Sequence, residues 1–440
     1  MSSPSLLIRR ARIILPDGNS IVGDVLTRDR QIIKVSASEI IDETSTRLID
    51  ADGLTLLPGV IDPQVHFREP GLEHKEDLFT ASCACAKGGV TSFLEMPNTR
   101  PLTISQEALN DKLQLAASKC LVNYGFFIGA TSDNLSELLY ASPTPGIKIF
   151  MGSMHGPLLV DPQETLEAIF ANGEILIAVH AEDQTRLKQR REEFANIHDV
   201  AIHSQIQDNQ AALIATQRAL KLSKKYRRRL HILHMSTAEE ANLLRQDKPS
   251  WVTAEVTPQH LFLNTTAYEK MGSLAQMNPP LRTSDDNEVL WQALLDGVID
   301  FIATDHAPHT LEEKAQTYPK TPSGMPGVET SLPLMLTAVE DGRCTLAQVV
   351  NWMSTAVASA YSIPNKGVIS AGYDADLVLV DLNSRKKVRR EELVTKCGWS
   401  PFEGWDLTGW PVTTIVGGEI VYDRGKLNTE IRGTPLKFEH

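Results

Sequence analysis

The 440-residue sequence is poor in cysteine and has no apolar run of membrane length, and both absences narrow its possible roles. Its five cysteines are scattered and include no C-x-x-C pair, which argues against a disulfide framework and against a zinc knuckle. No apolar run approaches the roughly 20 residues of a membrane span. The first residues, MSSPSLLIRRARIILPDG, lack the apolar core of a signal peptide. We therefore expect a cytoplasmic protein.

The chain also lacks a positive net charge. Its 43 Lys and Arg against 55 Asp and Glu give a formal charge of −12. This balance argues against general binding to nucleic acids or membrane surfaces. The basic run KKYRRRL (224–230) is typical of a helix end, where cations suit the helix dipole.

What the sequence does contain is a long alternation of strand-like and helix-like segments. Near-continuous apolar segments with polar residues at their carboxyl ends are typical of parallel strands covered on both faces. They are TLLPGVIDPQVHF (55–67), GVTSFLEMPN (89–98), NYGFFIGAT (123–131), GIKIFMG (146–152), ILIAVHAED (175–183), RLHILHMS (229–236), SWVTAEVTP (250–258) and IDFIATDHAPH (299–309). Eight such units predict a closed (β/α)₈ barrel. An open doubly wound sheet is the alternative, although no Gly-rich phosphate loop follows the first strand.

Both ends of the chain differ from this middle part. Short β-type segments separated by turn residues occur near the start, as in SLLIRRARIILPDG (5–18), and recur near the end, as in PVTTIVGGEIVYDRGKL (411–427). We expect a small β-sandwich domain built from residues 1–58 and 367–440. The barrel domain, residues 59–366, would be inserted between its two halves.

Polar side chains gather at the carboxyl ends of the predicted barrel strands, which is where barrel enzymes carry out their chemistry. They are His66, Arg68, Asn98, Lys148, His180, His234, Asp305, His306 and His309. Each has an ordinary structural alternative, such as a hydrogen-bonded histidine, a rim salt bridge or a helix cap. Their convergence at one end of a barrel favours a metal site, because imidazole and carboxylate ligands suit zinc or a similar divalent ion.

Lys148 is the least ordinary of these residues, because it lies among apolar neighbours in PGIKIFMG. A buried ammonium is costly unless it is paired or neutralised. Reaction with carbon dioxide neutralises the amine and turns it into a carboxylate-like metal ligand. The alternative is a lysine that points to a carboxylate at the barrel rim.

The ordered motifs along almost the whole chain resemble the amidohydrolase superfamily and, within it, the dihydroorotases. They are GVIDPQVHFREPG, GGVTSFLEMPNT, GIKIFMGS, IAVHAED, LHILHMST, TAEVTPQHL, MNPPLR, FIATDHAPH, SGMPGVET and KGVISAGYDADLVLVD. The resemblance implies a barrel flanked by a β-sandwich and assembly as a homodimer or larger oligomer. The implied reaction is reversible hydrolysis of (S)-dihydroorotate to N-carbamoyl-L-aspartate in pyrimidine biosynthesis.

The resemblance also implies a site for one or two zinc ions. His66 and Asp305 would bind the first ion, and His180 and His234 would bind the second. A carbamylated Lys148 would bridge the two. Asp305 would act as general base toward a metal-activated hydroxide and then as acid toward the leaving amide nitrogen.

The family pattern assigns the substrate contacts as well. Arg68 would bind the carboxylate of dihydroorotate with help from Asn98, since a planar guanidinium matches a carboxylate. Asn278 and His309 would complete the polar contacts to the ring. Allantoinases are similar but typically carry asparagine where Arg68 stands, and hydantoinases differ further in this motif.

Two glutamines depart from the pattern. The first family motif, HxH, here reads Gln64-x-His66, and Gln259 stands where dihydroorotases commonly have a second histidine. An amide oxygen is a poorer zinc ligand than imidazole, so the first metal is expected to be weak or absent. One alternative is a non-catalytic dihydroorotase-like scaffold, for instance for aspartate transcarbamoylase. The other is a related cyclic amidase of the allantoinase or hydantoinase type.

Overall fold

The computed structural model describes residues 5–42 and 46–439, and its centre is a ring of short parallel strands. The strands are β6 (Val60–Val65), β7 (Val90–Glu95), β8 (Asn123–Phe126), β9 (Ile128–Gly129), β10 (Ile147–Phe150), β11 (Ile177–His180), β12 (Leu230–Ile232), β13 (Val252–Val256) and β14 (Phe301–Ile302). Every pairing between them is parallel. One residue separates β8 from β9, so together they fill one position of the ring. The predicted (β/α)₈ barrel is thereby confirmed.

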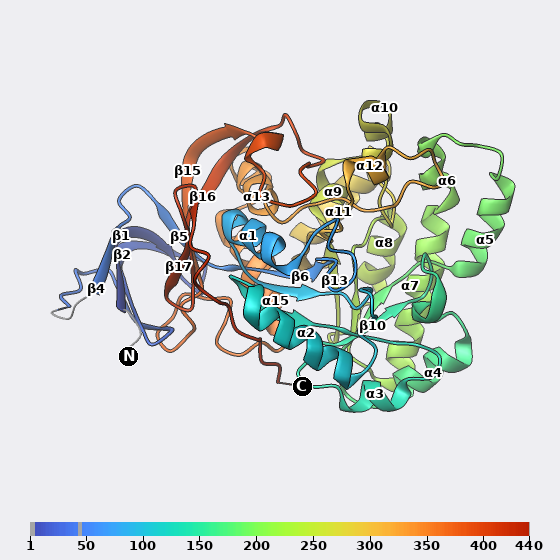
Figure 1. Cartoon of the computed structure of the whole chain (residues 1–440), viewed down its shortest axis with the longest axis horizontal. Coiled ribbons are helices and arrows are strands. Elements are labelled where there is room, and N and C mark those ends of the chain that lie inside the picture. The colour runs from blue at the N-terminus through green and yellow to red at the C-terminus, as the bar shows by residue number, and fades with distance from the viewer. Residues whose placement is uncertain (1–4, 43–45, 440) are drawn as a thin grey trace.

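Helices cover the outside of the barrel (Figure 1). The longer ones are α1 (Leu78–Gly88), α2 (Gln106–Lys119), α4 (Gln163–Ala171), α5 (Gln184–Glu193), α7 (Asn209–Tyr226), α8 (Ala238–Asp247), α11 (Ser284–Leu295) and α13 (Ser331–Glu340). The shorter ones are α3 (Leu135–Tyr140), α6 (His203–Ile206), α9 (Pro258–Phe262), α10 (Ala267–Met271), α12 (Leu311–Lys314), α14 (Leu346–Val350) and α15 (Ala356–Ala360). Within the described ranges, no helix is long and apolar enough to cross a membrane.

Helix α7 illustrates how the local sequence specifies these elements. The side chain of Asp208 accepts a hydrogen bond from the backbone N–H of Ala211 and so caps the first turn. Small buried residues such as Ala215 and Ala219 let the helix pack closely on the strands. Its last turn carries Lys224 and Lys225, so the basic run does end a helix as predicted.

The two ends of the chain meet in one nine-stranded sheet (Figure 1). Its strands are β1 (Ser5–Ile14), β2 (Ser20–Arg28), β3 (Gln31–Ser36), β4 (Thr46–Asp50), β5 (Thr55–Pro58), β15 (Leu377–Lys387), β16 (Asp406–Val416), β17 (Glu419–Asp423) and β18 (Lys426–Leu427). Antiparallel pairing of β5 with β15 joins the halves. Apolar residues of both halves, among them Ile8, Val25, Leu379 and Ile415, form one core, as the predicted β-sandwich requires.

The barrel closes between its first and last strands. The backbone N–H of His66 donates to the carbonyl oxygen of His306 at 2.7 Å, and Val65 forms a parallel bridge with the same residue. Just below, the buried carboxylate of Asp62 accepts from the backbone N–H (3.1 Å) and the hydroxyl (2.6 Å) of Thr304. Burial raises the pKa of Asp62 to about 7 despite these bonds. The Asp62 side chain thus links β6 to the end of β14 by hydrogen bonds.

We expect Asp62→Ala to lower the free energy of unfolding by about 3 kcal/mol, because it leaves buried donors of Thr304 without an acceptor. Urea unfolding followed by fluorescence measures the change. Asp111→Ala, which removes an exposed carboxylate from α2, serves as the matched control and should stay within about 0.5 kcal/mol of the parent. Equal stability of the two variants would contradict a stabilising role for the hydrogen bonds between Asp62 and Thr304.

Candidate active site

A polar cavity of about 130 Å³ opens at the carboxyl ends of the barrel strands. Its lining residues are Gln64, His66, Arg68, Asn98, Lys148, Phe150, Ser153, Met154, His180, His234, Asn278, Asp305, Ala307, Ser323 and Gly324. Of the ten residues that the sequence assigned to the strand-end cluster or to the substrate contacts, eight are in this set and His309 and His306 are not. His309 lies behind Arg68, with its Nε2 atom 3.1 Å from the Arg68 Nη2 atom. His306 faces elsewhere and accepts from the backbone N–H of Gly327.

One oxygen of Asp305 is the focus of the first group of side chains. The Asp305 Oδ1 atom lies 3.1 Å from Nε2 of His66 and accepts from Nε2 of Gln64 at 3.2 Å. On its other side, His66 Nδ1 lies 2.7 Å from Oδ1 of Asn98 and donates to it, because an amide oxygen can only accept. Burial lowers the pKa of His66 against the opposing effect of Asp305.

Lys148, His180 and His234 form the second group. The His180 Nδ1 and His234 Nε2 atoms are 2.9 Å apart, so two imidazole nitrogens converge. Glu182 holds His180 from behind, with its Oε2 atom 2.7 Å from the His180 Nε2 atom. Lys148 Nζ lies 4.5 Å above the ring of Phe150, and burial lowers its pKa to about 7. A large fraction of this amine is therefore uncharged at neutral pH.

The side chains of this second group could ligate a divalent metal ion only if Lys148 is one of the ligands. Among the residues that the structure describes, no three His, Cys, Asp or Glu side chains form a group that could hold a metal. The Nζ atom of Lys148 and the Nδ1 atom of His234 are buried and have no hydrogen-bond partner there. An uncharged, unpartnered amine can take up carbon dioxide, and a carbamate beside two imidazoles is a suitable ligand set for zinc.

Arg68 is a buried guanidinium without a carboxylate partner. Its Nε atom donates to the carbonyl oxygen of Pro308 at 3.0 Å, but within the described chain it forms no ion pair with Asp or Glu. Burial lowers its pKa to about 10, which still leaves it charged at neutral pH. The carboxylates of Asp305, Glu95 and Glu313 favour its charge from a distance but do not contact it, so an anionic ligand in the cavity would find a guanidinium open to a direct contact.

Three of the site residues have strained backbones. The φ angles of Arg68, His234 and Asp305 are 69°, 36° and 46°, in the left-handed region that disfavours residues with a side chain. Such conformations cost on the order of 1–3 kcal/mol each and persist only where the surroundings enforce them. Barrel closure and side-chain hydrogen bonds supply that enforcement, so the site is held in shape before any ligand binds.

Two positioning residues were missed by the sequence interpretation. His203 donates through Nε2 to the Oδ1 atom of Asn278 at 2.8 Å, and burial lowers its pKa to about 4, so it is neutral. It is the first residue of the short helix α6, far from any strand end, and no local pattern marks it. Glu182 had a usable signal, since a carboxylate two residues after a candidate ligand histidine often orients it.

Lys314 is the third missed residue, and it anchors the rim of the cavity. The segment TLEEKAQTYPKTP (310–322) is rich in polar residues, yet it contains this fully buried lysine. Its Nζ atom donates to the carbonyl oxygens of Gln276 (3.0 Å), Pro322 (3.0 Å) and Gly324 (3.2 Å). It therefore ties the loop that carries Asn278 to the loop that lines the cavity.

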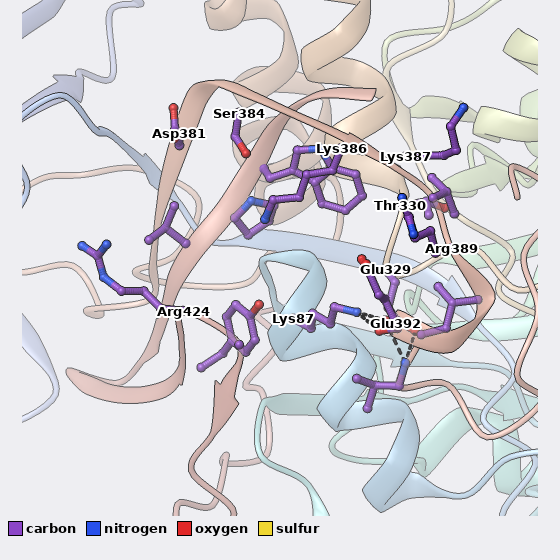
Figure 2. A pocket seen from close by; sticks show the side chains of 18 of the residues that line it. Lys87, Glu329, Thr330, Asp381, Ser384, Lys386, Lys387, Arg389, Glu392 and Arg424 are labelled. Atoms are coloured by element: carbon purple, nitrogen blue, oxygen red, sulfur yellow. Dashed lines mark hydrogen bonds and ion pairs between the residues drawn. The ribbon is translucent and has the colours of Figure 1, made fainter. Parts of the chain in front are cut away.

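A larger cavity of about 560 Å³ lies elsewhere, between α1 and the β15–β16 hairpin. Figure 2 shows Lys87 reaching from α1 toward Glu329, with which it forms a 3.2 Å ion pair. Glu329 also accepts from the backbone N–H groups of Val394 and Thr395. Of the described residues around this cavity, none belongs to the converging histidine and lysine set. The smaller cavity is therefore the candidate active site.

Comparison with known proteins places the whole chain among hydrolases. The amidohydrolase family model matches residues 55–421. The dihydroorotase of Methanosarcina acetivorans is 35% identical over 438 residues, covering 96% of this chain and 91% of its own. The dihydroorotase of Anoxybacillus flavithermus is 33% identical over 434 residues, covering 96% and 99%.

Solved structures are similar along their full lengths. The L-hydantoinase (dihydropyrimidinase) of Arthrobacter aurescens superposes with a TM-score of 0.93 at 30% identity, covering 98% of this chain and 99% of its own. The dihydropyrimidinase of Brevibacillus agri gives a TM-score of 0.92 at 27% identity, covering 99% of both chains. The fold is shared by enzymes named for different cyclic amides.

We expect Lys314→Met to reduce the free energy of unfolding by about 3 kcal/mol, because three buried carbonyl groups lose their donor. Lys320→Met, an exposed lysine of the same segment, is the control and should change it by less than about 0.5 kcal/mol. Denaturant unfolding of the two variants decides the matter. A Lys314 variant as stable as its control would show that the rim does not depend on this anchor.

Proposed function

The chain belongs to the amidohydrolase family, and we propose that within it the protein is a dihydroorotase. Water would add across the cyclic amide of (S)-dihydroorotate, the ring C–N bond would break, and N-carbamoyl-L-aspartate would form. Ring closure is the reverse step and the one that pyrimidine biosynthesis uses. Sequence relatives named dihydroorotase at about 35% identity over nearly the whole chain support this choice.

The observation that carries the proposal is the unpaired guanidinium of Arg68 in the cavity. Dihydroorotate bears a carboxylate on its ring, whereas the hydantoins and dihydropyrimidines for which the solved relatives are named lack one. A planar cation without a partner discriminates between these substrates. In our proposal Arg68 and Asn98 bind that carboxylate, Asn278 contacts the ring, and His309 supports Arg68 from behind.

Lys148, His180 and His234 are the residues that we propose hold the metal, with His66 and Asp305 beside them. The Lys148 amine would attack carbon dioxide, form a C–N bond and lose one proton, which leaves a carbamate anion. Two imidazoles and a carbamate oxygen favour zinc. When bound, a divalent zinc ion supplies Lewis acidity that polarises the scissile carbonyl and makes water nucleophilic near neutral pH.

Asp305 is the proposed general base and acid. Its Oδ1 atom accepts a hydrogen bond from Gln64 and lies 3.1 Å from His66 Nε2, while its Oδ2 atom accepts no hydrogen bond from the described residues. The free oxygen would take a proton from the attacking water and return it to the ring nitrogen as the C–N bond breaks. In ring closure the same carboxylate would remove the proton from the carbamoyl nitrogen.

The proposal extends to the setting of the enzyme. All five cysteines are free thiols, as is usual in reducing compartments, which supports the cytoplasm as its location. A homodimer or larger homo-oligomer is part of the proposal. Association with aspartate transcarbamoylase belongs to the alternative of a non-catalytic scaffold. Eight chemically matched side chains converge in one cavity, and this convergence disfavours that alternative.

Arg68→Met should lower kcat/KM for dihydroorotate by about 100-fold, because a charge-assisted contact to the carboxylate is lost. Dihydrouracil, which is the same ring without the carboxylate, should be turned over at a rate that changes far less. Ultraviolet loss on ring opening follows both reactions. Arg100→Met, at an exposed position, is the matched control. Equal losses on the two substrates would contradict the role of Arg68 in carboxylate binding.

Asp305→Asn should reduce turnover of dihydroorotate by about 1,000-fold through loss of the proton acceptor, while bound metal per chain stays the same. Kinetics and elemental analysis on one preparation measure both quantities. Asp296→Asn, at the exposed end of α11, is the control and should retain full activity. A scaffold protein would show no dihydroorotate turnover before or after either substitution.

A further inference from the structure

We propose, on the premise that the protein is a dihydroorotase, that Gln64 is a positioning residue that holds Asp305 by hydrogen bonding. Gln64 stands where the family motif has a metal-binding histidine, yet it presents a donor to Asp305 and not a lone pair to a metal. This chain would then bind one metal ion, at Lys148, His180 and His234, and not two.

The orientation of the Gln64 amide is set by its surroundings. Gln64 is buried, its Nε2 atom donates to Oδ1 of Asp305 at 3.2 Å, and its Oε1 atom meets no donor in the described part of the chain. The reverse orientation would place Oε1 against a carboxylate oxygen, and two acceptors repel each other. The N–H side of the amide therefore faces Asp305.

The backbone fixes the separation of these two residues. The N–H of Gln64 donates to Oδ1 of Asp62 at 3.3 Å, and the same carboxylate holds Thr304, the neighbour of Asp305. From the opposite side Gln259 Nε2 donates to the carbonyl oxygen of Thr304 at 3.0 Å. Barrel closure thus brings the side chains of Gln64 and Asp305 within hydrogen-bond distance.

The hydrogen end of the Gln64 amide disfavours a cation at the first metal position. A metal shared by His66 Nε2 and Asp305 Oδ1 would lie beside an N–H group that points to the same oxygen, and the positive ends repel. That position would also have one imidazole, whereas His180 and His234 supply two at the other. The second position therefore retains the better ligand set, and Asp305 is left free for proton transfer.

Metal content distinguishes this proposal from a two-metal site without reference to activity. Chain purified with zinc and bicarbonate and then dialysed should contain about one zinc per chain by elemental analysis. Gln64→His should raise the value to about two, because an imidazole lone pair replaces the N–H donor. Gln217→His, at an exposed position of α7, is the matched control and should stay at one.

A second measurement tests the inference on the unaltered protein, in case the Gln64 variant fails to fold. Anomalous scattering from zinc in crystals of the unaltered protein should give one peak per chain, between His180 and His234. Two peaks, or two zinc ions per unaltered chain, would overturn the inference, as would a folded Gln64→His variant that still binds one. Absence of dihydroorotate turnover in a one-zinc sample would instead refute the proposed function and leave the metal count standing.

Discussion

The hydrogen bonds that join β6 to the end of β14 are the constraint on which the rest of the site depends. The His66 backbone donates to His306, and the Asp62 carboxylate binds Thr304, so the first and last strands of the barrel meet in register. This closure brings side chains about 240 residues apart into contact, as between Gln64 and Asp305. Without it the polar residues at the strand ends would remain separate features of separate loops.

The closed barrel holds several groups in states that are unfavourable without a ligand. Lys148 is a buried amine with no hydrogen-bond partner among the described residues, and Arg68 is a buried cation that no described carboxylate contacts. Strained backbones at His234 and Asp305 add to the cost. Carbamylation and a metal ion would provide partners for Lys148, and a substrate carboxylate would provide one for Arg68. The stability of the folded barrel therefore offsets the cost of holding these groups in position before a ligand binds.

The fold itself does not choose the substrate. Enzymes named for hydantoins and dihydropyrimidines share nearly the whole architecture of this chain, whereas its sequence relatives are named dihydroorotases. In our proposal the discriminating feature is local: it is the guanidinium at position 68, which contacts His309 and Pro308. Function here depends on a few side chains placed on a common scaffold.

The sequence by itself determined the barrel, the terminal sandwich and the side chains at the strand ends, because apolar runs that end in polar residues specify buried parallel strands. It also showed that Gln64 breaks the family motif. Only the tertiary structure decided which way the Gln64 amide points, that His309 lies behind Arg68, and that His203 and Lys314 support the cavity. Those outcomes depend on distances between residues far apart in the chain, and local pattern contains no information about such distances.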